Sequence, residues 1–233
     1  MTTFCDLPTD GLLRRLRPQL LLMLFGVLLA ACGGDGGGSD APAPPAPQPP
    51  PPPATVPPVS ATVIDLEDGH TVGTQHWPAG NTSMGGQGQA MGTMQCLNSQ
   101  PVAYHVHTHL SIFLNGEQLA LPSRVGFVTG SSSSNDCHYP LHTHDATGMI
   151  HVHGTAPALF TLGQFFSIWG QSLTGTDIAG LTGMPVRVFV TDNGVATENT
   201  GDWTQIELSS HREITVQVGT DITAIPSYSW VGP

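Results

Sequence analysis

Lysine is absent from this chain of 233 residues, and its six basic side chains are all arginine. Seventeen Asp and Glu residues oppose them, which gives a formal charge of −11. So few cations cannot neutralise a run of phosphates, and this argues against nucleic acid as a partner. Without lysine there is also no Schiff-base nucleophile and no P-loop lysine. What the chain does have is eleven histidines, and an acidic, histidine-rich chain is suited to holding a cation.

A long transmembrane run is also missing. The apolar stretch at residues 20–31 follows three arginines and is short for a bilayer span, so it is typical of a secretory signal. It ends in Leu-Ala-Ala-Cys at residues 29–32, which resembles the lipobox of bacterial lipoproteins, where cleavage precedes the cysteine that receives the lipid. We expect a signal peptide at residues 1–31, acylation of Cys32, and membrane attachment through this lipid. The alternative is an ordinary signal peptide that leaves Cys32 as a spare thiol.

By the Gram-negative sorting rule, Gly33 after the cysteine resembles an outer-membrane signal. The expected location is therefore the cell envelope, with the protein facing the periplasm or the cell surface. Residues 32–60 follow as a glycine- and proline-rich tether, and residues 41–58 hold 11 of the 21 prolines. Such a segment should run as polyproline II and act as a spacer.

Residues 61–233 read as a single β-rich domain of α+β class, with mainly antiparallel sheet and one short helix. The clearest strand is YHVHTHLSIFL at 104–114, followed by an Asn-Gly hairpin turn. The remaining elements are a return strand at 118–121, a hairpin of 141–145 with 149–154, a helix at 161–173, and strands at 185–191, 204–208 and 213–218. The order hairpin, helix, hairpin suggests a β-grasp-like C-terminal half. Residues 61–100 show no clear periodicity.

Two cysteines, Cys96 and Cys137, fall inside this domain. Exported proteins fold in an oxidising environment, so a disulfide between the two cysteines is the leading interpretation. The alternative makes Cys137 a metal ligand beside His138, as in a cupredoxin-like copper site.

Eight of the eleven histidines lie within 49 residues, and seven of these fall in the two predicted hairpins. His105, His107 and His109 alternate with Val106 and Leu110, so they share one strand face opposite an apolar face. The segments LHTH and IHVH repeat this alternation in the second hairpin. If both hairpins join one sheet, four to six imidazoles converge, a composition suited to zinc, copper, nickel or iron.

Copper and zinc are the two metals we expect. Asp145, directly after LHTH, is a ligand or an acceptor that fixes a histidine tautomer. The methionines Met84, Met91 and Met94 favour copper weakly, because thioethers suit Cu(I). We expect about one ion per chain, held through four of the histidines and supported by the rest. The predicted site residues are His105, His107, His142 and His144, with His109, His151 and Asp145 in support.

Two other interpretations of the histidines stay open: a solvated polar sheet face, and a pH sensor whose imidazoles titrate near neutrality. The motifs HVHTHLSIFLNG, CHYPLHTHDATGMIHVHG and FTLGQFFSIWG resemble a family of largely uncharacterised secreted or lipid-anchored bacterial and archaeal proteins. The resemblance covers most of residues 95–220 and implies one domain with a defined site, but no named activity. Relatives of this pattern often carry glutamate where this chain has His153, so His153 is left out of the predicted ligands.

Three functions fit these features. The first is a lipid-anchored protein that sequesters, delivers or senses copper or zinc, with a partner protein in the envelope. The second is a metalloenzyme with an open metal position and Asp145, Glu117 or Asp136 as general base, although no HExxH motif is present. The third is a structural or interaction lipoprotein, under which the histidine alternation has no explanation.

The lipid anchor has a direct test. Because acylation requires the cysteine thiol, Cys32→Ser should move the protein from the membrane fraction to the soluble or secreted fraction, and label from a fatty-acid precursor should disappear. Membrane fractionation of the native host, or of a Gram-negative expression host, measures this. Cys96→Ser serves as the control, since it should stay in the membrane fraction. A Cys32→Ser protein that remains membrane-bound and labelled would refute the anchor.

Overall fold

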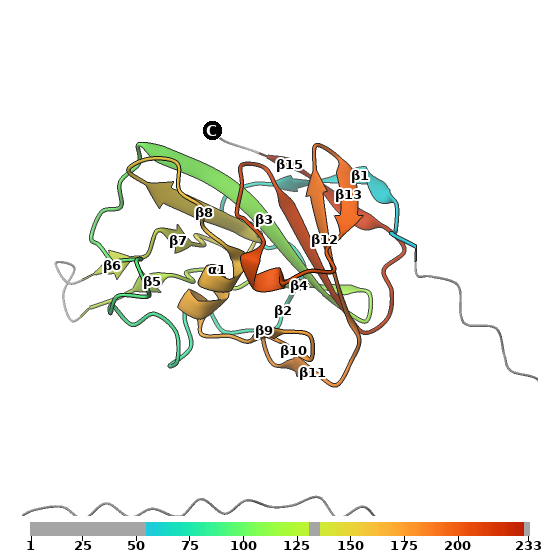
Figure 1. The fold of residues 1–233 in the computed structure, drawn as a ribbon, viewed down its shortest axis with the longest axis horizontal. Coiled ribbons are helices and arrows are strands. Elements are labelled where there is room, and N and C mark those ends of the chain that lie inside the picture. The colour runs from blue at the N-terminus through green and yellow to red at the C-terminus, as the bar shows by residue number, and fades with distance from the viewer. Residues whose placement is uncertain (1–54, 131–135, 231–233) are drawn as a thin grey trace, which may run out of the picture. The chain divides into compact units, whose positions relative to one another are not determined.

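The large sheet is built around one long strand, β3 (Tyr104–Leu114), in a computed structural model that describes residues 55–130 and 136–230 (Figure 1). β3 pairs in parallel with β14 (Glu213–Val218) along one edge. Along its other edge it pairs antiparallel with β8 (Met149–Gly154) and then with β4 (Glu117–Ala120). The signal peptide at 1–31, Cys32 and most of the tether lie outside the described residues.

Shorter elements complete the fold. The sheet continues from β14 through β12 to β13, and from β4 to β2, while β7 pairs with β8. The remaining bounds are β1 Val59–Leu66, β2 Thr74–Gln75, β5 Phe127–Val128, β6 Cys137–His138, β7 Leu141–His142, α1 Leu162–Trp169, β9 Leu173–Thr174, β10 Asp177–Ile178, β11 Leu181–Thr182, β12 Val186–Asp192, β13 Val195–Glu198, η2 Trp203–Gln205 and β15 Ile225–Trp230. The described residues contain no helix long and apolar enough to cross a membrane.

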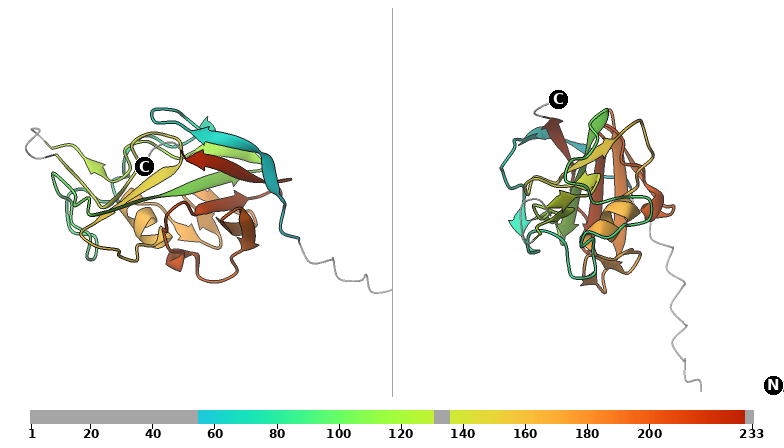
Figure 2. Two further views of the ribbon diagram at one scale, coloured as in Figure 1. Left: turned by 90° about the horizontal axis from the view of Figure 1, so that it is seen from above. Right: turned by 90° about the vertical axis from the view of Figure 1, so that its left-hand side faces the viewer.

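Period-two alternation divides the two faces of the large sheet. Leu110, Ile112 and Ile150 are at most 1% exposed and face the main core, together with α1. Phe113 and Ile225 belong to a second apolar cluster on the other face, beneath the parallel pair β1–β15. Figure 2 shows α1 and the β1–β15 pair on opposite sides of the sheet. The face opposite α1 is thus covered at one end by β15, and the histidine end of β3 lies beyond that cover.

The predicted class, mainly β with one short helix, is confirmed, as is the antiparallel pairing of most strands. The Asn-Gly turn after β3 is also present, with both residues at positive φ (51° and 87°), as a two-residue hairpin of this kind requires. Parallel pairing of β3 with β14, and of β1 with β15, makes the sheets mixed rather than purely antiparallel. β1 begins at Val59, inside the segment assigned to the tether.

Two local predictions were wrong. The helix is shorter than 161–173, because Gly170 adopts the left-handed conformation (φ 77°) and ends it after Trp169. The strand expected at 204–208 is instead the 3-10 turn η2, followed by a single bridge between Thr161 and Glu207. Asp202 favours this turn, since its carboxylate accepts a hydrogen bond from the Thr204 amide at 2.9 Å.

Both cysteines of the domain are joined. The Cys96–Cys137 disulfide, with Cα atoms 5.3 Å apart, confirms the predicted pairing. Cys137 is therefore a structural residue and is not available as a thiolate ligand. The bond connects the irregular segment before β3 to β6, the short strand that contains His138.

The start of α1 provides a stability test. Thr161 forms a capping box with Gln164: its hydroxyl accepts from the Gln164 amide, and its own amide donates to the Gln164 side chain at 2.9 Å. Thr161→Ala should lower the free energy of unfolding by about 1 kcal/mol, measured by urea denaturation. Thr161→Ser keeps the hydroxyl and should lose much less. Equal losses in the two variants would show that the cap does not contribute.

Candidate metal centre

Side chains of seven histidines gather on the sheet face opposite α1. They come from β3, β6, β7, β8 and the loop after β7, and their rings contact one another in an unbroken chain. We call this group the histidine cluster; it consists of His105, His107, His138, His142, His144, His151 and His153. Two neighbouring pairs illustrate the packing: the ring centroids of His105 and His153 are 4.3 Å apart, and those of His144 and His151 are also 4.3 Å apart.

Strand register explains the convergence. In the antiparallel pair β3–β8, His105 lies opposite His153 and His107 lies opposite His151. In the pair β7–β8, His142 lies opposite His151 from the other side. Directly opposed residues on one face have side chains about 5 Å apart at their bases, so three strands present their imidazoles to a common space. The two histidine hairpins do pair in one sheet, which was the condition set by the sequence.

Two sets of three ligand atoms are close enough to share an ion. They belong to His105, His151 and His153, and to His142, His144 and His151; within each set the atoms lie within 4.8 Å of one another. Each triad contains one exposed member, His105 in the first and His144 in the second. The clustered triads can therefore hold a metal ion, and each has a ligand at the surface through which an ion can enter.

His142 is oriented by the backbone. Its Nδ1 donates a hydrogen bond to the Tyr139 carbonyl oxygen at 2.9 Å, because a carbonyl can only accept. This places the proton on Nδ1 and leaves the lone pair of Nε2 directed at Nε2 of His144, 3.1 Å away. A carbonyl that fixes the tautomer of a ligand is the arrangement found around metal-bound histidines.

Burial favours the neutral form of four members of the cluster in particular. Desolvation is the largest cause that lowers the pKa of His142 and His151 to about 2, and that of His107 and His153 to about 4; neighbouring imidazoles lower them further. At neutral pH these four rings are therefore neutral. A neutral imidazole keeps a lone pair for a metal ion, so no proton has to leave before the ion binds.

His153 carries the clearest sign of a missing partner. Both of its ring nitrogens are buried, and neither forms a hydrogen bond. Buried polar atoms in folded proteins are nearly always satisfied by protein or water, and an unsatisfied one calls for an explanation such as an unseen ion. A metal ion bound to His105, His151 and His153 would supply that partner.

The structure does not bring His109 into the cluster. His109 is fully buried, its Nε2 donates to the Thr147 carbonyl oxygen at 2.8 Å, and its ring lies 3.8 Å from the Tyr228 ring of β15. Asp145 is also engaged elsewhere: its carboxylate accepts from the Thr147 amide and hydroxyl and from the Gly69 amide. Asp145 thus closes the turn before β8 and belongs to neither triad.

Two other acids expected as general bases also have structural partners. Glu117 accepts a hydrogen bond from the Thr74 hydroxyl at 2.6 Å, at the opposite end of β3 from the cluster. Asp136 accepts from the Gly130 amide at 2.8 Å. None of the three methionines lies on a strand of the cluster: Met94 is buried in the main core, Met91 packs against that core, and Met84 is 84% exposed.

Two members of the cluster were absent from the predicted ligand set. Alternation alone places His153 on the same strand face as His151, so the sequence did indicate it as a ligand. It was left out of the predicted ligands because the family that the chain resembles often has glutamate at this position. His138 lies on the two-residue strand β6, and its ring centroid is 4.9 Å from that of His142. A strand of two residues is too short to show a periodic pattern in the sequence. His138 was therefore recognised as a cluster member only from its contact with His142 in the structure.

The lowered pKa values predict how stability depends on pH. In the unfolded chain the histidines titrate near 6.5, whereas His153 titrates near 4 in the folded one, so the unfolded state binds more protons between these values. The free energy of unfolding of the metal-free protein should be steady above pH 7 and fall as the pH drops from 6.5 towards 4. Urea denaturation across pH 4–8 measures this.

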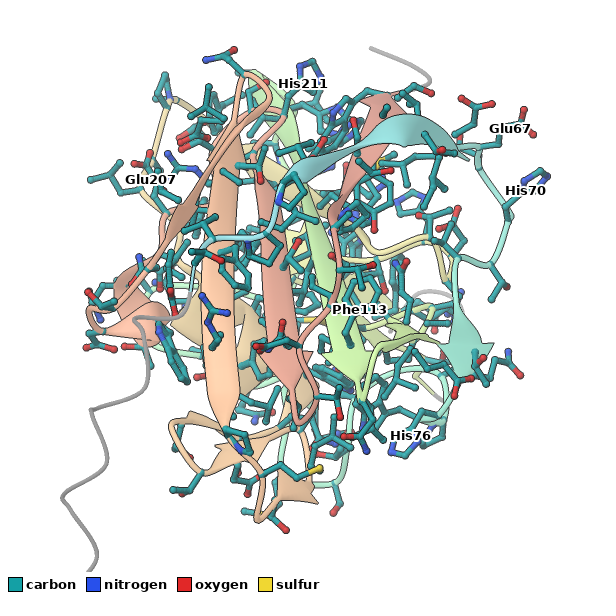
Figure 3. All side chains as sticks on the ribbon, turned by 90° about the vertical axis from the view of Figure 1, so that its right-hand side faces the viewer. Glu67, His70, His76, Phe113, Glu207 and His211 are labelled. Atoms are coloured by element: carbon teal, nitrogen blue, oxygen red, sulfur yellow. A yellow bond between two sulfur atoms is a disulfide. The ribbon has the colours of Figure 1, made fainter. Side chains whose placement is uncertain are left out.

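His153→Leu should flatten that slope by up to one proton, because it removes one titrating group and no hydrogen bond. The control is His70→Leu, since His70 projects from the loop after β1, away from the sheet (Figure 3). This control leaves every cluster histidine in place, so the contribution of His153 to the slope should persist. A His153→Leu protein with an unchanged slope would contradict the assigned burial.

Comparison with known proteins adds no further constraint. No family model matches the chain, no curated protein matches it, and no solved structure matches it. The candidate metal centre therefore rests on the chemistry and positions of its own side chains.

Proposed function

We propose that the protein is a lipid-anchored protein of the cell envelope that binds copper or zinc through the histidine cluster, in order to sequester the ion, deliver it or sense it. The observation that carries this proposal is His153, whose two buried ring nitrogens have no partner beside two other potential ligands. Imidazole suits both metals. The lipid anchor rests on the lipobox-like sequence before Cys32, and the disulfide agrees with an oxidising location.

Reversible binding fits the site better than a structural ion. The residues behind the ligands, Leu110, Ile150 and Val152, are at most 1% exposed and belong to the main core. Apolar packing therefore contributes to holding the strands that present the ligands. An exposed ligand in each triad gives a bound ion a route to a partner protein.

The acidic chain supports capture of a cation. Outside the predicted signal peptide only three arginines remain, and two of them are neutralised by pairing: Arg187 with Glu198 at 2.8 Å and Arg212 with Asp192 at 2.9 Å. A net negative surface raises the local concentration of cations and speeds their arrival. The chain thus combines an attractive field with neutral ligands at the site itself.

Calorimetric titration of the metal-free full chain with Cu²⁺ and with Zn²⁺ tests the proposal. We expect a dissociation constant of about micromolar or tighter for at least one metal. Replacing His105, His107, His142 and His144 together by glutamine should weaken binding at least tenfold, because it removes ligands from both triads. The matched control replaces His70 and His76, which belong to neither triad, and should bind like the native protein.

Two outcomes would refute the proposal. One is that neither Cu²⁺ nor Zn²⁺ binds the native chain at micromolar concentrations. The other is equal binding by the four-histidine variant and the native chain, with both folded by circular dichroism. Metal analysis of protein purified from its host's envelope would then distinguish copper from zinc.

A further inference from the structure

The cluster is a grid of two rows across three strands. The first row runs from His107 on β3 through His151 on β8 to His142 on β7, each directly opposite the next. The second row contains His105 on β3 opposite His153 on β8. His151 is the centre of the grid, since it has a histidine directly opposite it on each neighbouring strand, His107 on β3 and His142 on β7.

His151 is also the residue common to both triads. On one side its Nδ1 lies 3.3 Å from Nε2 of His105. On the other side its ring is parallel to that of His142, with an interplanar angle of 3°, and its ring centroid is 4.3 Å from that of His144. An imidazole has two nitrogens that point in different directions, so one ring can serve two ions.

We propose that the histidine cluster holds two transition-metal ions, with His151 bridging them through its two ring nitrogens. This inference rests on the proposed metal-binding function and adds its stoichiometry. One ion binds with His105 and His153, the other with His142 and His144. Binding of the second ion displaces the N–H proton of His151, which passes to the solvent. The resulting imidazolate carries one negative charge between the two cations and reduces their repulsion.

The number of imidazoles agrees with two ions rather than one. A structural zinc or copper site takes about four ligands, so a single ion would leave three rings of the cluster crowded together without a role. The first triad has a fourth imidazole beside it, because Nε2 of His107 is 3.0 Å from Nε2 of His105. The second has one in His138, whose ring lies 4.9 Å from that of His142. Seven imidazoles that share one make two sites of four.

Copper titration with a magnetic readout tests the bridge. The full chain is loaded stepwise with Cu²⁺, bound copper is counted by elemental analysis after desalting, and the electron paramagnetic resonance signal is integrated. We expect two coppers per chain. An imidazolate bridge couples their unpaired electrons antiferromagnetically, so in frozen solution at liquid-helium temperature the integrated signal per copper should fall as the second equivalent binds.

Variants separate the bridge from the two sites. His151→Gln removes the bridging ring, so any copper that it binds should give the full uncoupled signal. His153→Gln damages one site alone, so tight binding should fall from two coppers to one, again uncoupled. His70→Gln is the matched control and should behave as the native chain. Circular dichroism checks that each variant is folded, and His153→Gln keeps the test decisive if His151→Gln does not fold.

Each outcome has a clear meaning. Two coppers with a diminished signal that His151→Gln restores would support the inference. A single copper in the native chain would overturn it and leave the proposed metal-binding function intact, and two coppers with the full signal of two spins would overturn the bridge. No bound copper, together with no bound zinc, would refute the proposed function itself.

Discussion

Antiparallel pairing of β3 with β8 is the interaction on which the histidine cluster depends. It sets His105 against His153 and His107 against His151, and the same strand β8 then receives β7 with His142. A slip of one residue would turn every histidine of β8 toward the core, where Ile150 and Val152 are fully buried. The apolar residues therefore hold the register, and the register in turn positions the ligands.

Much of this fold could be predicted from local sequence. Alternation in YHVHTHLSIFL gave the correct faces of β3, and the Asn-Gly turn marked its hairpin, because both signals depend on neighbouring residues alone. The pairing of β1 with β15 joins residues more than 150 positions apart, so no pattern of neighbouring residues could predict it. Residues 204–208 alternate like a strand, but the Asp202 cap bends the chain into η2 instead.

The site follows the same division. Alternation predicted that His105, His142, His144 and His151 would be presented together, and they are. His109 belongs to the same alternating series, but Tyr228 of a distant strand covers it, and the Thr147 carbonyl takes its proton. The Asp145 carboxylate could act as a metal ligand by its chemistry. In the structure, however, its two oxygens accept hydrogen bonds from the amides of Gly69 and Thr147. Long-range packing decides which histidines of an alternating series remain available to bind a metal ion. The spacing of the histidines in the sequence does not contain this information.

The position of β1 has a mechanical consequence. Any pull transmitted along the N-terminal segment enters the described part of the chain at β1, which pairs with β15 and with no strand of the large sheet. Under load β1 is held by its hydrogen bonds to β15 and by Leu66, which is fully buried in a cluster with Met149 of β8 and Tyr228 of β15. The sheet that carries the histidines is joined through β3, β8 and β14, so a pull on β1 would be shared with it through β15 and the cluster around Leu66.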